Sequence, residues 1–312
     1  MSETMPDNQP SMPHGSDTKS GFIAVLGAPN AGKSTFINRV VGTKVSIVSP
    51  KVQTTRTRVL GIMMRGDAQL IFIDTPGIFE PRRRLDRAMV AAAWSGAADA
   101  DLVVLLVDCK RGFDNDTRRI VKNLKEQNRR VALALNKVDL VKKPDLLALA
   151  ASLNEAATFT DTYMISALNG DGVDDLLNDL TAALPPGPWL FPPDQVSDMP
   201  ARLLAAEITR EQLYLQLRQE LPYSATVETE SWEERPDGSV AINQVIYVER
   251  DSQKGIVLGK GGARIKSIGA NARAELEGIL EQKVHVMLFV KVREKWSDDP
   301  ERYRDWGLDF GA

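Results

Sequence analysis

Short apolar runs alternate with longer stretches of helical periodicity between residues 21 and 184. The runs are brief and have few polar interruptions, as expected for strands that are buried on both faces of a sheet. Helices between such strands indicate parallel crossover connections. We therefore predict an α/β domain with a doubly wound, mostly parallel sheet over residues 21–184. The predicted strands are 22–26, 70–73, 102–107, 131–135 and 162–165.

The pattern changes after residue 184. Residues 185–200 contain six prolines, which disfavour helix and sheet and stiffen a connection, so we predict a linker there. Residues 201–312 are predicted to form a smaller α+β domain with a C-terminal tail. Its predicted elements are a helix at 201–220, extended stretches at 224–233 and 240–249, a helix at 264–282 and a strand at 284–292.

Residues 1–20 are polar and rich in Pro and Ser, and we predict a disordered tail. Across the 312 residues, 39 Lys and Arg oppose 42 Asp and Glu, so no global basic field indicates a nucleic-acid-binding protein. The single cysteine excludes an internal disulfide framework and favours a cytoplasmic setting. No apolar run is long enough to span a membrane.

A glycine-rich segment follows the first predicted strand. It matches the pattern Gly-x-x-x-x-Gly-Lys-Ser and precedes a helix-like stretch, which is the context of a phosphate-binding loop. Lys33 is expected to reach the β and γ phosphates and the Ser34 hydroxyl to bind Mg²⁺. An ordinary glycine turn is the alternative for this motif alone. The predicted contacts are Gly27, Ala28, Pro29, Asn30, Ala31, Gly32, Lys33, Ser34 and Thr35.

A second motif, Asp74-Thr75-Pro76-Gly77, follows the predicted strand 70–73. The Asp74 carboxylate can hold Mg²⁺, and the Gly77 amide can meet the γ phosphate. Between the two motifs lies Gln53-Thr54-Thr55-Arg56, where a threonine hydroxyl could complete the magnesium shell. We favour Thr55 over Thr54, with a solvated loop as the alternative. Lys33, Thr55 and Gly77 are thus the candidate catalytic groups.

Asn136-Lys137-Val138-Asp139 follows the strand 131–135 and indicates which base is bound. The Asp139 carboxylate can accept hydrogen bonds from the N1–H and exocyclic amine of guanine, a donor pair that adenine lacks. Asn136 can pair with another edge of the base, and the Lys137 stem can cover the ring. Ser166-Ala167 would supply a backbone N–H that donates to the guanine carbonyl. We predict GTP and GDP as ligands.

Together these motifs resemble the Era family, whose GTPase domain is of the Ras-like, translation-factor class. The resemblance implies a P-loop GTPase. In Ras-like enzymes a glutamine just after Asp-x-x-Gly orients the attacking water, whereas this chain has Ile78, so slow unaided hydrolysis is expected. Asn30 matches a position at which relatives can use an asparagine to bind K⁺ beside the phosphates, with a loop-stabilising hydrogen bond as the alternative.

The second domain contains the loop Gly259-Lys260-Gly261-Gly262. A Gly-x-x-Gly loop brings the backbone of KH domains against about four nucleotides. Residues 252–274 contain five basic and no acidic residues, which concentrates positive charge at this loop. The order of elements indicates a type II KH domain, with a plain basic turn as the alternative. The predicted RNA contacts are Lys254, Gly259, Lys260, Gly261, Gly262, Arg264 and Lys266.

Because this domain also resembles Era, the family implies binding of 16S ribosomal RNA near its 3′ end and a role in 30S subunit assembly. A monomer is expected, and weak peripheral contact with the inner face of the cell membrane is left open. The competing hypothesis is an RNA-binding assembly module whose nucleotide site is structural. A tRNA-modification GTPase would be expected to carry a C-terminal cysteine, which this chain lacks.

Overall fold

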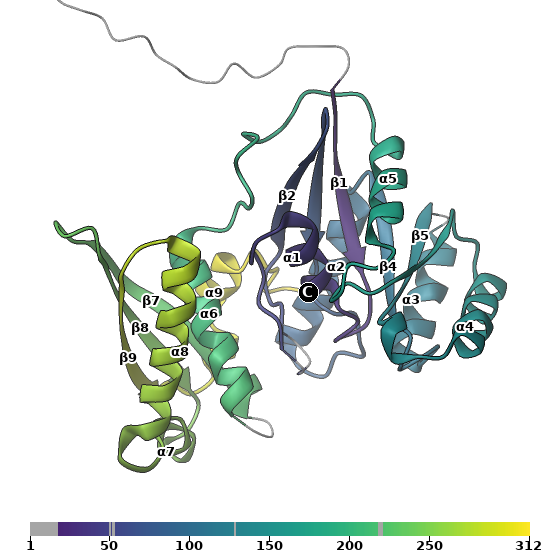
Figure 1. The fold of residues 1–312 in the computed structure, drawn as a ribbon. Coiled ribbons are helices and arrows are strands. Elements are labelled where there is room, and N and C mark those ends of the chain that lie inside the picture. Colours follow the sequence, from purple (N-terminus) through teal and green to yellow (C-terminus); the bar gives the residue numbers. More distant parts are fainter. Residues whose placement is uncertain (1–17, 50, 52–53, 128, 218–220) are drawn as a thin grey trace, which may run out of the picture.

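The fold is taken from a computed structural model that describes residues 18–49, 51, 54–127, 129–217 and 221–312. Two domains lie side by side (Figure 1). The first holds a six-stranded sheet and the second a three-stranded sheet. Within the described residues, no helix combines the length and apolar character needed to cross a membrane.

The first domain alternates strands and helices, as the apolar pattern predicts. Its sheet has the order β2-β3-β1-β4-β5-β6, with every neighbouring pair parallel except β2 and β3. The predicted mostly parallel sheet is therefore confirmed. The elements are β1 (Lys19–Leu26), α1 (Lys33–Val41), β2 (Val59–Arg65), β3 (Ala68–Asp74), α2 (Arg84–Asp99), β4 (Leu102–Asp108), α3 (Asn115–Glu126), β5 (Val131–Asn136), α4 (Lys143–Ala156), β6 (Thr162–Ile165) and α5 (Val173–Ala183).

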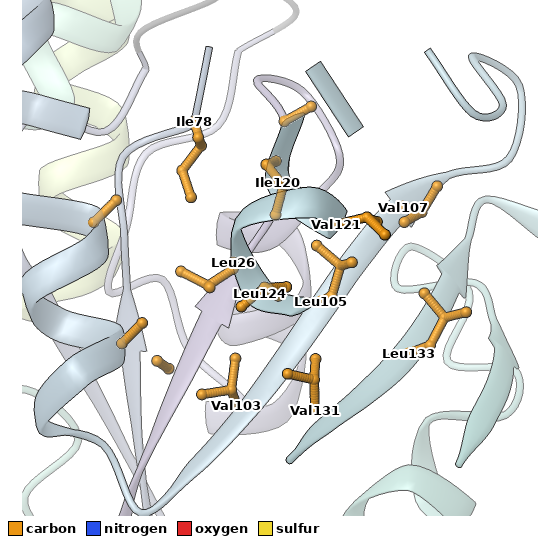
Figure 2. Close-up of a cluster of buried hydrophobic side chains, with 14 of the residues drawn as sticks. Leu26, Ile78, Val103, Leu105, Val107, Ile120, Val121, Leu124, Val131 and Leu133 are labelled. Atoms are coloured by element: carbon orange, nitrogen blue, oxygen red, sulfur yellow. The ribbon is translucent and has the colours of Figure 1, made fainter. Parts of the chain in front are cut away.

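Helices cover both faces of this sheet. Side chains of α1 and α5 pack on one face, and side chains of α2, α3 and α4 pack on the other. Figure 2 shows Leu124 of α3 lying next to Leu26 of β1 and Leu105 of β4, the two central strands. This double layer fixes the carboxyl ends of the parallel strands, from which the predicted site loops emerge.

The ends of the first domain differ in part from prediction. The first strand begins at Lys19, so residues 19–20, which composition assigns to the tail, belong to the sheet. The reason is pairing that composition cannot reveal: Lys19 lies opposite Ala68 of β3, and Ser20 N donates to Pro185 O at 3.4 Å. The rest of the predicted tail, residues 1–17, lies outside the described residues. Residues 185–200 contain only isolated bridges, such as Gly61 to Ser197.

The second domain has the KH element order, and its predicted α+β class is confirmed. In its sheet, β7 and β8 are antiparallel and β8 and β9 are parallel. Helices α6 and α8 pack on one face through the Ala205, Ile208, Ala272 and Leu276 side chains. The elements are α6 (Ala201–Gln216), β7 (Ala225–Glu234), β8 (Val240–Val248), α7 (Asp251–Leu258), α8 (Ala263–Leu280), β9 (Val284–Val292) and α9 (Pro300–Asp305).

The C-terminal segment packs against the first domain. Trp296, Tyr303 and Trp306 form a buried aromatic cluster with Leu85 and Met89 of α2. The chain end accordingly lies beside the first domain in Figure 1. The segment that we expected to be a tail thus connects the two domains through aromatic packing.

Candidate functional site

The loop between β1 and α1 has the backbone shape that a phosphate site requires. Gly32 has φ +98°, and a Cβ added there would lie 2.3 Å from Nδ2 of Asn136. Only glycine fits this conformation and spacing. Helix α1 begins at Lys33, so its free N–H groups point into the loop, where they favour an anion.

A cavity of about 220 Å³ lies over this loop. It brings together residues from the phosphate loop, from the segment after α1 and from the loop after β3. Its lining residues are Pro29, Asn30, Gly32, Lys33, Ser34, Thr35, Ile47, Val48, Ser49, Thr54, Thr55, Gly77 and Lys137. Sequence motifs did not identify Ile47, Val48 and Ser49, because they carry no recognisable pattern.

The Lys33 side chain is almost wholly buried in this loop. Its Nζ donates to the carbonyl oxygens of Gly27 at 3.2 Å and Ala28 at 3.1 Å. Burial lowers the pKa of Lys33 to about 8, although the nearby Asp74 carboxylate partly opposes this shift. A phosphate would supply the anionic partner that these neutral carbonyls do not.

Three hydroxyl groups converge on the Asp74 carboxylate at the end of β3. Oδ2 of Asp74 accepts from Ser34 Oγ at 2.8 Å, Ser46 Oγ at 2.5 Å and Thr55 Oγ1 at 3.2 Å. Oδ1 is buried and has no hydrogen-bond partner among the described residues. Burial raises the pKa of Asp74 despite these hydrogen bonds. Ser46 was missed by sequence reasoning because it belongs to no motif.

The two candidate threonines have different surroundings. Thr55 Oγ1 lies 3.1 Å from Ser34 Oγ and faces Asp74. Thr54 Oγ1 instead donates to Lys51 O at 2.8 Å and lies 3.0 Å from Ser49 Oγ. Only Thr55 therefore has its hydroxyl at the carboxylate. Gln53 of the same motif lies outside the described residues.

The residues after Asp74 divide between the site and the core. A Cβ added at Gly77 would lie 2.8 Å from Cα of Pro29, so glycine allows this loop to approach the phosphate loop. Thr75 Oγ1 donates to Val25 O at 2.7 Å, which is a structural contact. The Ile78 side chain points into the hydrophobic cluster of Figure 2 and is 1% exposed. Of these three residues, only Gly77 lines the cavity.

The predicted base-binding residues lie at the ends of β5 and β6. Asn136 Nδ2 donates to Ala31 O at 2.8 Å, and its Oδ1 accepts from Ala167 N at 2.9 Å. Asn136 thus joins the phosphate loop to the loop after β6. A pocket of about 200 Å³ lies here, lined by Gly32, Thr35, Asn136, Lys137, Asp139, Leu140, Ser166, Ala167 and Leu168.

Lys137 is held by a second set of contacts. Its Nζ donates to Asn30 O at 2.7 Å and pairs with Asp108 Oδ2 at 2.6 Å. These contacts stretch its aliphatic stem along one side of the pocket. Leu140 and Leu168 are exposed at the rim, where they can pack on a planar base. Sequence reasoning missed Asp108, Leu140 and Leu168.

The Gly-x-x-Gly loop joins α7 to α8. Gly259, Gly261 and Gly262 have φ values of +70°, +58° and +77°, and no neighbouring atom lies within 4 Å of a Cβ added at Gly261 or Gly262. The backbone is therefore open to a ligand. Lys260 is exposed, and Arg264 Nη1 donates to Ile256 O at 2.7 Å, which ties the two helices together.

A groove of about 320 Å³ continues from this loop between α8 and β9. It combines basic side chains at its edge with apolar walls, a combination that suits phosphates and stacked bases. Its lining residues are Ile265, Lys266, Gly269, Ala270, Arg273, Val286 and Leu288. Lys254 lies on α7. The apolar walls could not be recognised from the Gly-x-x-Gly motif alone.

Comparisons with known proteins identify a GTPase domain and a KH domain in the chain. A family model described as a 50S ribosome-binding GTPase matches residues 22–137, and a KH domain model matches residues 220–297. The chain is 60% identical over 311 residues to GTPase Era of Rhizobium meliloti (strain 1021), covering 99% of each protein. It is 59% identical over 293 residues to GTPase Era of Brucella suis biovar 1 (strain 1330), covering 94% of each.

Solved structures give the same result. A crystal structure of a variant of Aquifex aeolicus Era bound to GDP and AlF4⁻ matches with a TM-score of 0.88 and 39% identity. A crystal structure of Era in complex with MgGDPNP and nucleotides 1506–1542 of 16S ribosomal RNA matches with the same values. Each match covers 93% of this chain and 99% of the other. With such similarity over nearly its whole length, the chain belongs to the Era family of GTPases.

Proposed function

We propose that this GTPase is a slow switch that binds 16S ribosomal RNA near its 3′ end and acts in assembly of the 30S subunit. The observation that carries the proposal is the presence, in one chain, of a pocket lined by the Asn136-Lys137-Val138-Asp139 motif and of a groove beside the Gly-x-x-Gly loop with basic side chains at its edge. It is supported by the related Era that holds MgGDPNP and a 16S RNA fragment. The nucleotide state would be read through the loops that contain Thr55 and Gly77.

We propose that Asp74, Ser34 and Thr55 hold Mg²⁺ together with the nucleotide phosphates. Their donor atoms fit the ion, because Mg²⁺ prefers oxygen ligands and Oδ1 of Asp74 is a buried acceptor with no partner among the described residues. When bound, Mg²⁺ would neutralise charge on the β and γ phosphates. Lys33 and the Gly77 amide would stabilise the same charge from the protein side.

Slow hydrolysis follows from the position of Ile78. Its aliphatic side chain is buried in the core, so it can neither polarise nor orient a water molecule. The remaining catalytic contribution is positioning and charge stabilisation by Lys33, Thr55 and Gly77. A partner, a second water or a backbone group would therefore have to orient the attacking water, and dependence on a partner would suit a switch.

We also propose K⁺ binding beside the phosphates through Asn30. This residue lines the cavity together with Ile47, Val48 and Ser49, so its side chain lies on the same side of the cavity as the phosphate loop. GTP hydrolysis should be faster in potassium than in sodium buffer, and Asn30→Ala should remove the difference. Equal wild-type rates in the two buffers would exclude the K⁺ site.

For the RNA site, we propose that phosphates contact the open loop Gly259–Gly262 and bases enter the groove between α8 and β9. Replacing Gly259 and Gly262 with Asp introduces two negative charges where phosphates would approach. We expect this double variant to lose RNA binding while GTP affinity stays unchanged. Undiminished affinity for a 16S 3′-end fragment would contradict the KH assignment.

We further propose a cytoplasmic monomer. Sedimentation at micromolar concentration should give the mass of one chain. Weak contact with the inner face of the cell membrane stays a separate hypothesis, to be tested by cosedimentation with anionic vesicles.

The decisive test of the switch is GTP hydrolysis measured with and without the 16S fragment. Hydrolysis should be stimulated by RNA and lost in Lys33→Ala. The second candidate function is an RNA-binding assembly module with a structural nucleotide site. Tight RNA binding that is identical with GTP, with GDP and without nucleotide would select that alternative.

A further inference from the structure

The segment that precedes β2 is held between the two domains. It contains Thr55, and helix α6 lies on the side of the second domain that faces the first (Figure 1). Thr55, Arg56 and Thr57 are all buried. The surroundings of Thr55 are thus set by the second domain as well as by the nucleotide pocket.

The residue before Thr55 is bound by an arginine of α6. The Thr54 carbonyl accepts a hydrogen bond from Nη2 of Arg210, which is 1% exposed. Arg210 is itself oriented by Glu207, whose Oε1 accepts from Nε at 2.7 Å. Burial lowers the pKa of Arg210, but the Glu207 carboxylate more than offsets this and the pKa is raised. The guanidinium therefore stays charged.

The residue after Thr55 is bound by three parts of the second domain. Arg56 Nη2 lies 3.2 Å from the Tyr214 hydroxyl on α6, and Nη1 donates to Ala225 O at 3.2 Å. The Arg56 guanidinium also lies 5.3 Å from the centroid of the Trp296 ring. Arg56 is 1% exposed, so these contacts are shielded from water.

Both chain neighbours of Thr55 therefore contact one face of α6, since Arg210 and Tyr214 are four residues apart on that helix. We propose that α6 of the second domain positions the Thr55 hydroxyl for Mg²⁺, with Arg56, Arg210 and Tyr214 as positioning residues. The inference rests on the proposed role of Thr55 in the magnesium site. It makes the RNA-binding domain a structural part of the GTPase site.

This arrangement also gives a physical path from RNA to GTP. Helix α8, which follows the Gly-x-x-Gly loop, is hydrogen-bonded to α6: Gln212 Nε2 lies 3.3 Å from Glu275 Oε2, and Asn271 Nδ2 lies 3.3 Å from Gln212 Oε1. RNA that shifts α8 would shift α6 and with it Thr55. By linkage, the effect of RNA on GTP affinity must equal the effect of GTP on RNA affinity.

The test uses the full chain with Arg56→Ala and the milder Tyr214→Phe, which removes only one hydroxyl. The matched control is Arg84→Ala, because the Arg84 guanidinium stacks on Phe310 at 4.4 Å across the same pair of domains but is attached to α2. Three quantities are measured for each protein: kcat for GTP hydrolysis, the Mg²⁺ concentration that gives half of that rate, and GDP affinity.

We expect Arg56→Ala to lower kcat about tenfold and to raise the Mg²⁺ requirement, with a smaller change of the same kind in Tyr214→Phe. GDP affinity should be unchanged in both, because Thr55 is expected to bind the ion only in the triphosphate state, and this also verifies folding. Wild-type kcat and Mg²⁺ dependence in both variants would overturn the inference. An equal loss in Arg84→Ala would overturn it as well, because general domain packing would then explain the effect.

The proposed function fails in a different way. If the wild-type protein neither hydrolyses GTP nor responds to RNA, the switch itself is wrong, and the positioning role falls with it. If the wild type hydrolyses GTP while the α6 variants match it, only the positioning role is wrong.

Discussion

GTP affinity should depend on pH through Lys33. In the free protein this ammonium group is buried against the neutral carbonyls of Gly27 and Ala28, and burial lowers its pKa to about 8 from 10.5. In the complex the γ phosphate would face the ammonium and raise its pKa again. Binding above pH 8 must therefore be accompanied by proton uptake.

The size of the effect follows from the pKa. Between pH 7 and pH 9 the charged fraction of Lys33 in the free protein falls from about nine-tenths to about one-tenth. If the bound form stays charged, GTP affinity falls about tenfold over this range, or about 1.4 kcal/mol. Below pH 7 the affinity should level off, because Lys33 is then charged in both states. The free energy of unfolding should change with pH in the opposite direction. Between about pH 8 and pH 10.5 the unfolded chain binds more protons at Lys33 than the folded chain, so the stability of the free protein should rise with pH over this range.

The assay is calorimetric titration with a non-hydrolysable GTP analogue at constant ionic strength. Lys33→Met is the matched control, because it removes the charge and leaves only the ionisation of the nucleotide itself. The wild type should bind about tenfold more weakly at pH 9 than at pH 7 after this subtraction. Identical pH slopes in the two proteins would refute the burial argument.

Three further predictions address base specificity, catalysis and stability. Asp139→Asn should weaken GTP binding by about tenfold to a hundredfold, since a charged hydrogen-bond acceptor is lost, and should favour xanthosine triphosphate. Unchanged GTP affinity in a competition assay would contradict the guanine assignment. Gly77→Ala should lower the rate of single-turnover GTP hydrolysis about a hundredfold. The added Cβ would lie 2.8 Å from Pro29 Cα and push the loop after β3 away from the phosphate loop. A wild-type rate would refute this role of Gly77. Phe72→Ala should lower the free energy of unfolding, measured in urea, by about 3–5 kcal/mol. Phe72 is fully buried and packs edge-to-face on Phe36, with 5.7 Å between the ring centroids. A loss under about 1 kcal/mol would contradict this packing.

Sequence patterns located the parallel strands because their signal is local. The expected strand 162–165 coincides with β6, and 131–135 differs from β5 by one residue. By contrast, β2 was not expected, because Gly61 interrupts its apolar run and its antiparallel pairing with β3 depends on a distant partner. An antiparallel strand of this kind takes its stability from tertiary pairing, which a local pattern does not contain.

The site residues also divide into those with a local sequence signal and those that depend on distant partners. Motifs placed Lys33, Asp74 and Asn136 because fixed spacing and a strand end suffice to locate them. Ser46, which donates to Asp74, and Arg210, which binds the Thr54 carbonyl, have no such spacing. Arg210 lies more than 150 residues from its partner, so only the folded chain brings the two together.

The coupling of GTP to RNA binding is tested most directly by one titration. The affinity for a 16S 3′-end fragment is measured with the protein loaded with a non-hydrolysable GTP analogue and again with GDP. The switch predicts tighter RNA binding with the GTP analogue, by about 5-fold to 150-fold if the coupling is of ordinary size. Equal affinities in the two nucleotide states would contradict it.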